Sequence, residues 1–189
     1  MIIKLPENVE LILSKLNNNG YEAYIVGGCV RDSLLGLVPH DWDICTSALP
    51  EQILEAFNDY KIIPTGLKHG TVTIVIDASQ YEITTYRIDG EYEDNRHHKE
   101  VSFTSNLKDD LSRRDFTINA MAYSPLIGLI DYFNGQDDLN KKIIKCVGDP
   151  NKRFNEDALR ILRCLRFSST YNFSIETKTS KSIHDNAYL

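Results

Sequence analysis

A short apolar run that ends in two glycines constrains this 189-residue chain more than any other stretch. Tyr24-Ile25-Val26 predicts a buried strand, Gly27-Gly28 a turn, and residues 30–35 a helix that ends at Gly36. Glycines lack the Cβ atom that would keep a phosphate from the backbone, and a helix start offers unpaired N–H groups. Arg31 adds a forked cationic donor. The stretch predicts a phosphate cradle, although such a turn alone is more often only a turn.

A pair of aspartates follows one loop later, in the run 40–44. We expect a strand here, which would place Asp41 and Asp43 on one face and Trp42 and Ile44 on the other. Two carboxylates on one face repel each other unless a cation lies between them, and hard oxygen ligands favour Mg²⁺. An Asp-x-Asp pair can also be a solvated surface. Beside a phosphate cradle, however, it indicates phosphoryl transfer, with Asp41 and Asp43 as the catalytic and metal-binding residues.

Composition narrows the class of protein. A hydrophobic content of 42% and a charged content of 25% are ordinary for a soluble globular protein, and no apolar run is long enough to span a membrane. The four cysteines are scattered without a Cys-x-x-Cys pair, which argues against zinc and disulfides and favours a cytoplasmic protein. A net charge of −6 argues against indiscriminate nucleic-acid binding, but residues 141–166 form a basic segment.

Periodicity predicts the other elements of a mixed α/β head. Helices are expected over residues 8–16 and 51–57, and strands over 71–76 and 81–86 with a turn at 77–80. Glu82 interrupts the second of these strands. Residues 88–107 lack periodicity and predict a long mobile loop, whereas the apolar positions from Phe116 onward predict a buried helix led by Arg114 and Asp115.

Gly148-Asp149-Pro150 predicts a domain boundary, followed by a helix over 156–167 with Asn155 as its N-cap. One face of this helix would be apolar, formed by Ala158, Leu162 and Leu165. A second face would carry Asp157, Arg160, Arg163 and Arg166.

Those charged residues have two interpretations. Ion pairs on a surface helix would contribute only tenths of a kcal/mol. Alternatively, an aspartate acceptor beside an arginine donor matches the pairing edges of cytosine and adenine and opposes those of guanine and uracil. The second interpretation predicts base recognition by Asp157 and Arg160, because mismatched polar groups would go unpaired.

Four segments together resemble the class II nucleotidyltransferases, the family of CCA-adding tRNA enzymes and bacterial poly(A) polymerases. They are GGCVRDSLLG at 27–36, DWD at 41–43, RRDFTINA at 113–120 and EDALR at 156–160. The resemblance implies a polymerase-β-like head over residues 1–147, with a mixed sheet flanked by helices, and the start of an all-α neck over 148–189. It also implies Mg²⁺-dependent transfer of CMP and AMP from CTP and ATP to the 3′ end of tRNA. Family members continue into further helical domains.

The resemblance also assigns roles to residues. It implies metal binding by Asp41 and Asp43, triphosphate binding by Gly28, Arg31 and Arg114, and a base template of Glu156, Asp157 and Arg160. Arg163 and Arg166 would hold the flank of the base or the triphosphate. Gly27 and Asp115 belong to the same segments, and Glu82 is either a third acid beside the aspartate pair or an edge glutamate that faces water.

Two alternatives stay open at this point. The chain could belong to an enzyme that adds only A, either a poly(A) polymerase or the A-adding half of a split pair. It could also be a nucleotide-binding module without turnover. In the resembling enzymes a loop at the position of residues 88–107 is associated with nucleotide choice, and here that segment has full length.

Overall fold

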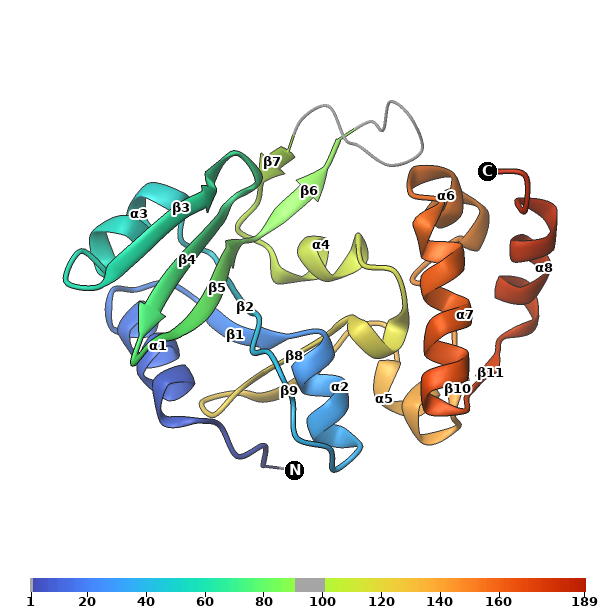
Figure 1. Cartoon of the computed structure of the whole chain (residues 1–189), viewed down its shortest axis with the longest axis horizontal. Helices are drawn as coiled ribbons and strands as arrows, with labels where there is room; N and C mark the ends of the chain where they lie inside the picture. The colour runs from blue at the N-terminus through green and yellow to red at the C-terminus, as the bar shows by residue number, and fades with distance from the viewer. Residues whose placement is uncertain (1, 91–100) are drawn as a thin grey trace.

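One seven-stranded sheet organises the chain, with the strand order β3-β4-β5-β2-β1-β8-β9 (Figure 1). The structure is a computed structural model that describes residues 2–90 and 101–189. β2 and β5 are parallel and the other neighbours are antiparallel, so the sheet is mixed as predicted. The strands are β1 Ala23–Val26, β2 Ile44–Thr46, β3 Lys61–Gly66, β4 Thr71–Ile76, β5 Ser79–Thr85, β8 Met121–Ser124 and β9 Gly128–Asp131.

Helices cover both faces of the central strands. α1 (Glu7–Asn18), α2 (Gly28–Leu34) and α3 (Pro50–Ala56) contribute to a large core that contains Ile25 of β1 and Ile44 of β2. On the other face, Tyr24 and Val26 pack in a second cluster with Leu107 and other residues, which α4 (Leu107–Ser112) helps to cover. Because both faces are covered, all of β1 is buried. The prediction of helices near 8–16 and 51–57 is confirmed.

The β4–β5 hairpin is confirmed with a shorter turn than expected. Its two loop residues, Asp77 and Ala78, have φ values of 49° and 64°, and β5 already begins at Ser79. Two consecutive residues with positive φ give a turn whose twist matches that of the flanking strands. Ser79 and Gln80 therefore belong to the ladder, opposite Ile76 and Val75.

Two predictions over residues 88–122 are wrong. Residues 88–107 are not wholly irregular, because β6 (Arg87–Asp89) pairs with β7 (Val101–Phe103) and Asn106 caps α4 through Lys108 N. Residues 91–100 lie outside the described residues. The buried helix from Phe116 is instead the short 3₁₀ helix η2 (Thr117–Asn119) followed by β8. These residues are buried as predicted, but a short apolar run does not distinguish a buried strand from a helix.

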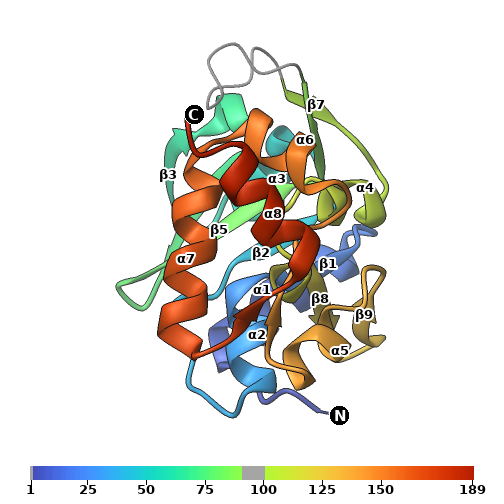
Figure 2. The same cartoon turned by 90° about the vertical axis from the view of Figure 1, so that its right-hand side faces the viewer.

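The C-terminal part contains α5 (Gly135–Asn140), α6 (Pro150–Glu156), α7 (Leu159–Tyr171) and α8 (Thr177–Asp185), with the short parallel pair β10 (Ile143–Ile144) and β11 (Ser174–Ile175). Figures 1 and 2 show α6, α7 and α8 gathered at the end of the molecule away from α3 and β3. The division at residues 147/148 stays a prediction, and the β10–β11 pairing joins its two sides.

The single helix predicted over residues 156–167 is two helices. Asp149 caps α6 by accepting a hydrogen bond from Asn151 N, so Asn155 lies inside α6 rather than at an N-cap. The helical conformation is then interrupted at Asp157, whose extended backbone separates α6 from α7. The predicted apolar face is also wrong, because Leu162 is 62% exposed and Leu165 47% exposed. The buried residues of α7 are Arg160, Cys164 and Phe167.

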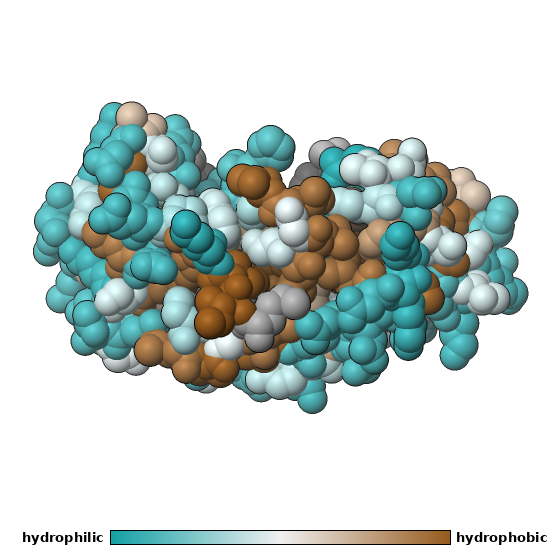
Figure 3. Space-filling view, turned by 90° about the horizontal axis from the view of Figure 1, so that it is seen from below, coloured by the Kyte–Doolittle hydropathy of each residue, from teal (hydrophilic) through white to brown (hydrophobic). Residues whose placement is uncertain are grey.

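Apolar side chains also gather on the face shown in Figure 3, seen from below Figure 1. Near the N-terminus a groove of about 480 Å³ is lined by Ile2, Leu37, Val38, Trp42 and their neighbours. Among the described residues, none of the helices has the length and apolar character that crossing a bilayer requires.

Candidate active site

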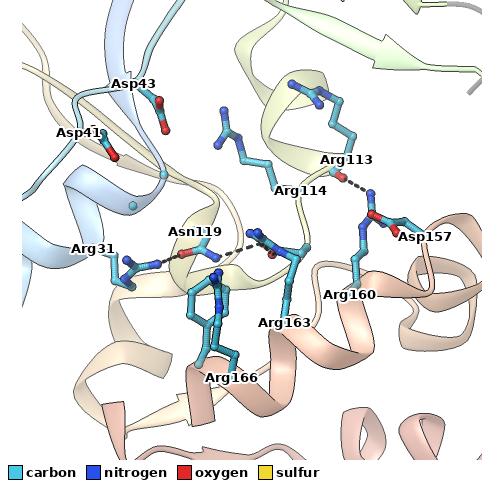
Figure 4. A pocket seen from close by; sticks show the side chains of 14 residues that line it. Arg31, Asp41, Asp43, Arg113, Arg114, Asn119, Asp157, Arg160, Arg163 and Arg166 are labelled. Carbon is cyan, nitrogen blue, oxygen red and sulfur yellow. Dashed lines mark hydrogen bonds and ion pairs between the residues drawn. The ribbon is translucent and has the colours of Figure 1, made fainter. Parts of the chain in front are cut away.

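A cavity of about 560 Å³ lies where the start of α2, the residues before β2, the end of α4 and α7 meet (Figure 4). It brings together every predicted site residue except Glu82 and Glu156. The cavity is lined by Gly27, Gly28, Arg31, Asp41, Asp43, Arg113, Arg114, Asp115, Asn119, Asp157, Arg160, Arg163, Arg166 and Phe167. Six arginines against four aspartates give it an excess of positive charge, which suits a polyanionic ligand.

The glycine turn has the geometry that its sequence predicts. Gly27 has a φ of +81° and precedes α2, and its N–H donates to the carbonyl of Met121 on β8. A Cβ atom at Gly27 would lie 2.9 Å from Arg114 Nη1. The positive φ therefore favours glycine here, and the absence of a Cβ atom lets Arg114 lie close to the turn.

The aspartate pair lies in the extended approach to β2 rather than within a strand, because β2 begins only at Ile44. The alternation still holds: Asp41 and Asp43 line the cavity, whereas Trp42 lines the apolar groove. Hydrogen bonding continues from β1 up to this point, since Val26 N donates to Asp43 O. The prediction of a strand at residues 41–43 is wrong, but its consequence for the two carboxylates is not.

Neither carboxylate is used by the fold. Within the described residues no group donates a hydrogen bond to the side-chain carboxylate of Asp41 or Asp43, although the backbone carbonyl of Asp43 accepts from Val26 N. Solvent reaches Asp43, yet the protein around it removes enough water to raise the pKa of its carboxyl; Arg114 opposes this effect and Asp41 adds to it. Figure 4 shows both side chains pointing into the cavity, with Arg114 across from Asp43.

The pair fits a hard divalent cation. Two unbonded carboxylates beside an open cavity match Mg²⁺, which protein sites commonly hold through one or two carboxylates plus water and substrate phosphates. No group of three or more His, Cys, Asp or Glu side chains suited to a metal is present in residues 2–90 and 101–189. Glu82 is exposed on β5 opposite Thr73 and does not line the cavity, so the structure does not bring it to the pair.

A buried carboxylate that the sequence analysis missed supports two of the arginines. Asp110 is 1% exposed and accepts from Arg113 Nη2 at 2.8 Å, from Arg114 Nη2 at 3.4 Å and from Arg87 N at 3.2 Å. Burial alone would raise the pKa of Asp110, but Arg114 and Arg113 outweigh it and the pKa is lowered. The spacing of three and four residues within α4 and its end is the sequence signal that could have indicated this cluster.

Contacts within the protein hold the Arg31 side chain more firmly than a side chain that is free to bind phosphate would be held. It is 6% exposed, and its Nε donates to Asp32 while its Nη1 donates to Asn119. Its guanidinium carbon lies 5.1 Å from the ring centre of Phe167 and 4.8 Å from that of Tyr171. Nη2 is the one nitrogen of this guanidinium without a hydrogen-bond partner among the described residues.

The residues predicted to form one charged face line one wall of the cavity, with Asp157 just before α7 and three arginines on it, and they are held by other groups to different degrees. Arg160 is 7% exposed and donates to Glu156, to Arg153 O and to Arg113 O. Glu156 therefore contributes by holding Arg160 rather than by lining the cavity. Asp157 uses one carboxylate oxygen to cap α7 through Leu159 N at 3.0 Å.

Arg163 and Arg166 complete this wall. Both Arg163 Nε and Nη2 contact Asp115 Oδ2, at 2.8 Å and 2.7 Å. Asp115 Oδ1 accepts from Asn119, another residue that the sequence analysis missed. Arg166 stacks on Phe167 with 4.9 Å to the ring centre, and no carboxylate of the described residues pairs with it.

Comparisons with known proteins agree with this geometry. A family model described as "Poly A polymerase head domain" matches residues 23–145. The CCA-adding enzyme of Lactobacillus helveticus is 51% identical over 178 residues, which cover 94% of this chain and 44% of that protein. The CCA-adding enzyme of Oceanobacillus iheyensis is 52% identical over 172 residues, 91% of this chain and 42% of that protein.

A crystal structure of the Bacillus stearothermophilus CCA-adding enzyme in complex with CTP has a TM-score of 0.89 to this chain at 43% identity. The match covers 98% of this chain and 45% of that one. The chain thus spans less than half the length of these relatives.

Proposed function

Because the chain belongs to the poly A polymerase head domain family, we propose that it forms the catalytic head of a template-independent RNA nucleotidyltransferase. It would add CMP and AMP to the 3′ end of tRNA from CTP and ATP. Its relatives carry the name CCA-adding enzyme, and one of the similar structures is a complex with CTP. The observation that supports this proposal is the set of residues that line the 560 Å³ cavity. It combines an unbonded aspartate pair, a glycine turn and a wall of arginines in the space of one nucleotide.

In this reaction the 3′ hydroxyl oxygen of the RNA forms a bond to the α-phosphorus of the nucleotide. The bond between that phosphorus and the bridging oxygen breaks, pyrophosphate leaves, and the hydroxyl loses its proton. Asp41 and Asp43 would hold Mg²⁺, which would supply a Lewis acid to make the attacking hydroxyl more acidic and to neutralise charge on the leaving pyrophosphate. This family of nucleotidyltransferases generally needs a divalent metal.

The protein's own part is mainly positioning and charge. Gly27 and Gly28 leave room for the triphosphate to approach the backbone at the start of α2. Arg114, which pairs with the buried Asp110, places positive charge in the same region. Arg166 adds a charge that no described carboxylate neutralises. Arg31 contributes with its remaining nitrogen.

Base recognition would come from the α6–α7 junction. Asp157 keeps one carboxylate oxygen for the amino group that cytosine and adenine share, because the other oxygen caps α7. Arg160, fixed by Glu156 and two backbone carbonyls, supplies the donor beside it, with Arg163 at the flank. We place this activity in the cytoplasm, where the buried free thiols Cys29, Cys45, Cys146 and Cys164 would stay reduced.

The deciding experiment offers radiolabelled CTP and ATP separately to tRNA that ends before the two Cs, and to tRNA that ends after them. Addition of C to the first and A to the second supports the proposal. Addition of A alone would identify an A-only enzyme. Tight nucleotide binding without any addition would identify a binding module, and the variant Asp43→Ala gives the background of the assay.

A further inference from the structure

The C-terminal end of α7 is tied to α2 by side chains that lie outside the 560 Å³ cavity. Tyr171 Oη donates to Asp32 Oδ1 at 3.0 Å, and the same oxygen accepts from Arg31 Nε at 2.8 Å. Asp32 and Tyr171 line instead an adjoining cavity of about 430 Å³, which shares Arg31, Asp41 and Asp43 with the first. Neither residue has a part in the proposed chemistry, so the tie needs its own explanation.

Arg31 strengthens this connection. Its guanidinium lies against Phe167 and Tyr171, which are one helical turn apart on the same side of α7. A desolvated cation beside aromatic rings gains more than an exposed one, and Arg31 is almost fully buried. Nη1 continues the chain of contacts to Asn119, which in turn donates to Asp115, the partner of Arg163.

These contacts fix the spacing between the two elements that the nucleotide must bridge. The glycine turn that receives the triphosphate opens α2, and the residues proposed for base recognition flank the start of α7. A nucleotide therefore spans from one helix to the other. Any shift of α7 against α2 would move Asp157 and Arg160 relative to the phosphate site.

We infer that Asp32 and Tyr171 are positioning residues that set α7 against α2 and thereby sharpen the choice of base. The inference rests on the proposed function. The opposing explanation is that the tie stabilises the fold without affecting recognition. The two explanations differ for ligands that touch only one side: inorganic tripolyphosphate needs the glycine turn and the arginines, but it makes no use of the base-recognition residues.

The test measures dissociation constants of CTP, UTP and tripolyphosphate by titration calorimetry, with thermal unfolding recorded for each variant. Tyr171→Phe removes only the hydroxyl and keeps the ring on Arg31. The matched control is Tyr188→Phe, at a side chain that is 78% exposed. We expect Tyr171→Phe to weaken CTP binding about fivefold to tenfold, the net contribution typical of one hydrogen bond, and to narrow the preference for CTP over UTP. Tripolyphosphate binding should stay within about twofold.

A second variant checks that the effect comes from the pair. Asp32→Asn removes the charge that holds both Arg31 and Tyr171, so it should weaken tripolyphosphate as well as CTP. Adding Tyr171→Phe to Asp32→Asn should then cost much less than it costs in the wild-type protein.

Three results overturn the inference. If Tyr171→Phe binds CTP and UTP with the affinities of the wild-type protein, the contact between Tyr171 and Asp32 has no part in base recognition. A common loss for all three ligands would make it purely structural. If the wild-type protein binds tripolyphosphate but does not prefer CTP over UTP, base recognition in the proposed function fails and the inference fails with it.

Discussion

The aspartate pair on one wall of the cavity and most of the arginines on the other differ in whether their charges are paired within the protein. On the wall of the glycine turn, the side-chain carboxylates of Asp41 and Asp43 have no hydrogen-bond donor among the described residues. On the wall of α4 and α7, Arg113, Arg160 and Arg163 each pair with a carboxylate of the protein. Unpaired like charges destabilise the protein and are useful only to a ligand, whereas paired charges also maintain the architecture. Substitutions of the unpaired charges should therefore affect activity, and those of the paired arginines should affect stability as well.

The largest effect is expected for Asp41→Ala and Asp43→Ala. Each should lower the rate of nucleotide transfer by about a thousandfold or more, or about 4 kcal/mol, because the cation that the carboxylates hold would be lost. The free energy of unfolding without Mg²⁺ should stay equal or rise, since a repulsion is removed. Transfer assays and urea denaturation measure the two quantities.

The matched control for this pair is Asp59→Ala, which removes a surface carboxylate paired with Lys15 and should leave the rate unchanged. Ordinary turnover in either Asp41→Ala or Asp43→Ala would contradict the metal assignment.

Arg160→Ala should show the opposite balance. It removes one of the two arginines that pair with Glu156, the other being Arg153, and it removes the link to Arg113 O. The expected cost is about 1–3 kcal/mol in the free energy of unfolding, because buried hydrogen bonds to charged groups are lost. It should also raise incorporation of UTP and GTP relative to CTP. A stability loss below about 0.5 kcal/mol would show that Arg160 does not hold the wall together.

Asp110→Asn should cost about 1–3 kcal/mol at pH 7, because it removes a buried acceptor of charged hydrogen bonds. The pKa of Asp110 is lowered from its ordinary 3.8 in the folded protein. Its contribution is therefore complete above that value and disappears as the pH falls through the lowered pKa. Denaturation curves of the two proteins should converge in acid, and a constant difference down to strongly acidic pH would refute the assigned role of the charge.

The smallest effect on stability is expected for Arg166→Ala, since this arginine pairs with no described carboxylate. The free energy of unfolding should change by no more than about 0.5 kcal/mol. CTP affinity should fall about twofold to fivefold, and the loss should shrink as salt is added, because the charge is exposed to screening. A loss of stability as large as that of Arg160→Ala would place Arg166 with the paired charges.

The parts of the structure that depend on neighbouring residues could be predicted from the sequence, and the parts that depend on distant residues could not. The glycine turn, α1 and the β4–β5 hairpin depend on neighbouring residues, so local patterns indicated them. The burial of Arg160 could not be predicted, because it depends on the carbonyl of Arg113, which lies 47 residues earlier. The role of Arg31 was likewise hidden, since Asn119 and Tyr171 reach it from distant parts of the chain. The prediction of a helix from Phe116 was wrong because the residues that follow η2 form strand β8 of the sheet.

The position of β8 has a consequence for the way the protein is made. β8 pairs with β1 through Ile25 and Tyr123, and Met121 O accepts the N–H of Gly27. A ribosome delivers β1 and the glycine turn long before it delivers β8. Until then one edge of β1 stays open to pairing with other chains, and the turn lacks its carbonyl partner. The proposed nucleotide binding would therefore be a late event in the synthesis of the chain, and synthesis arrested before residue 121 would release a product prone to aggregation.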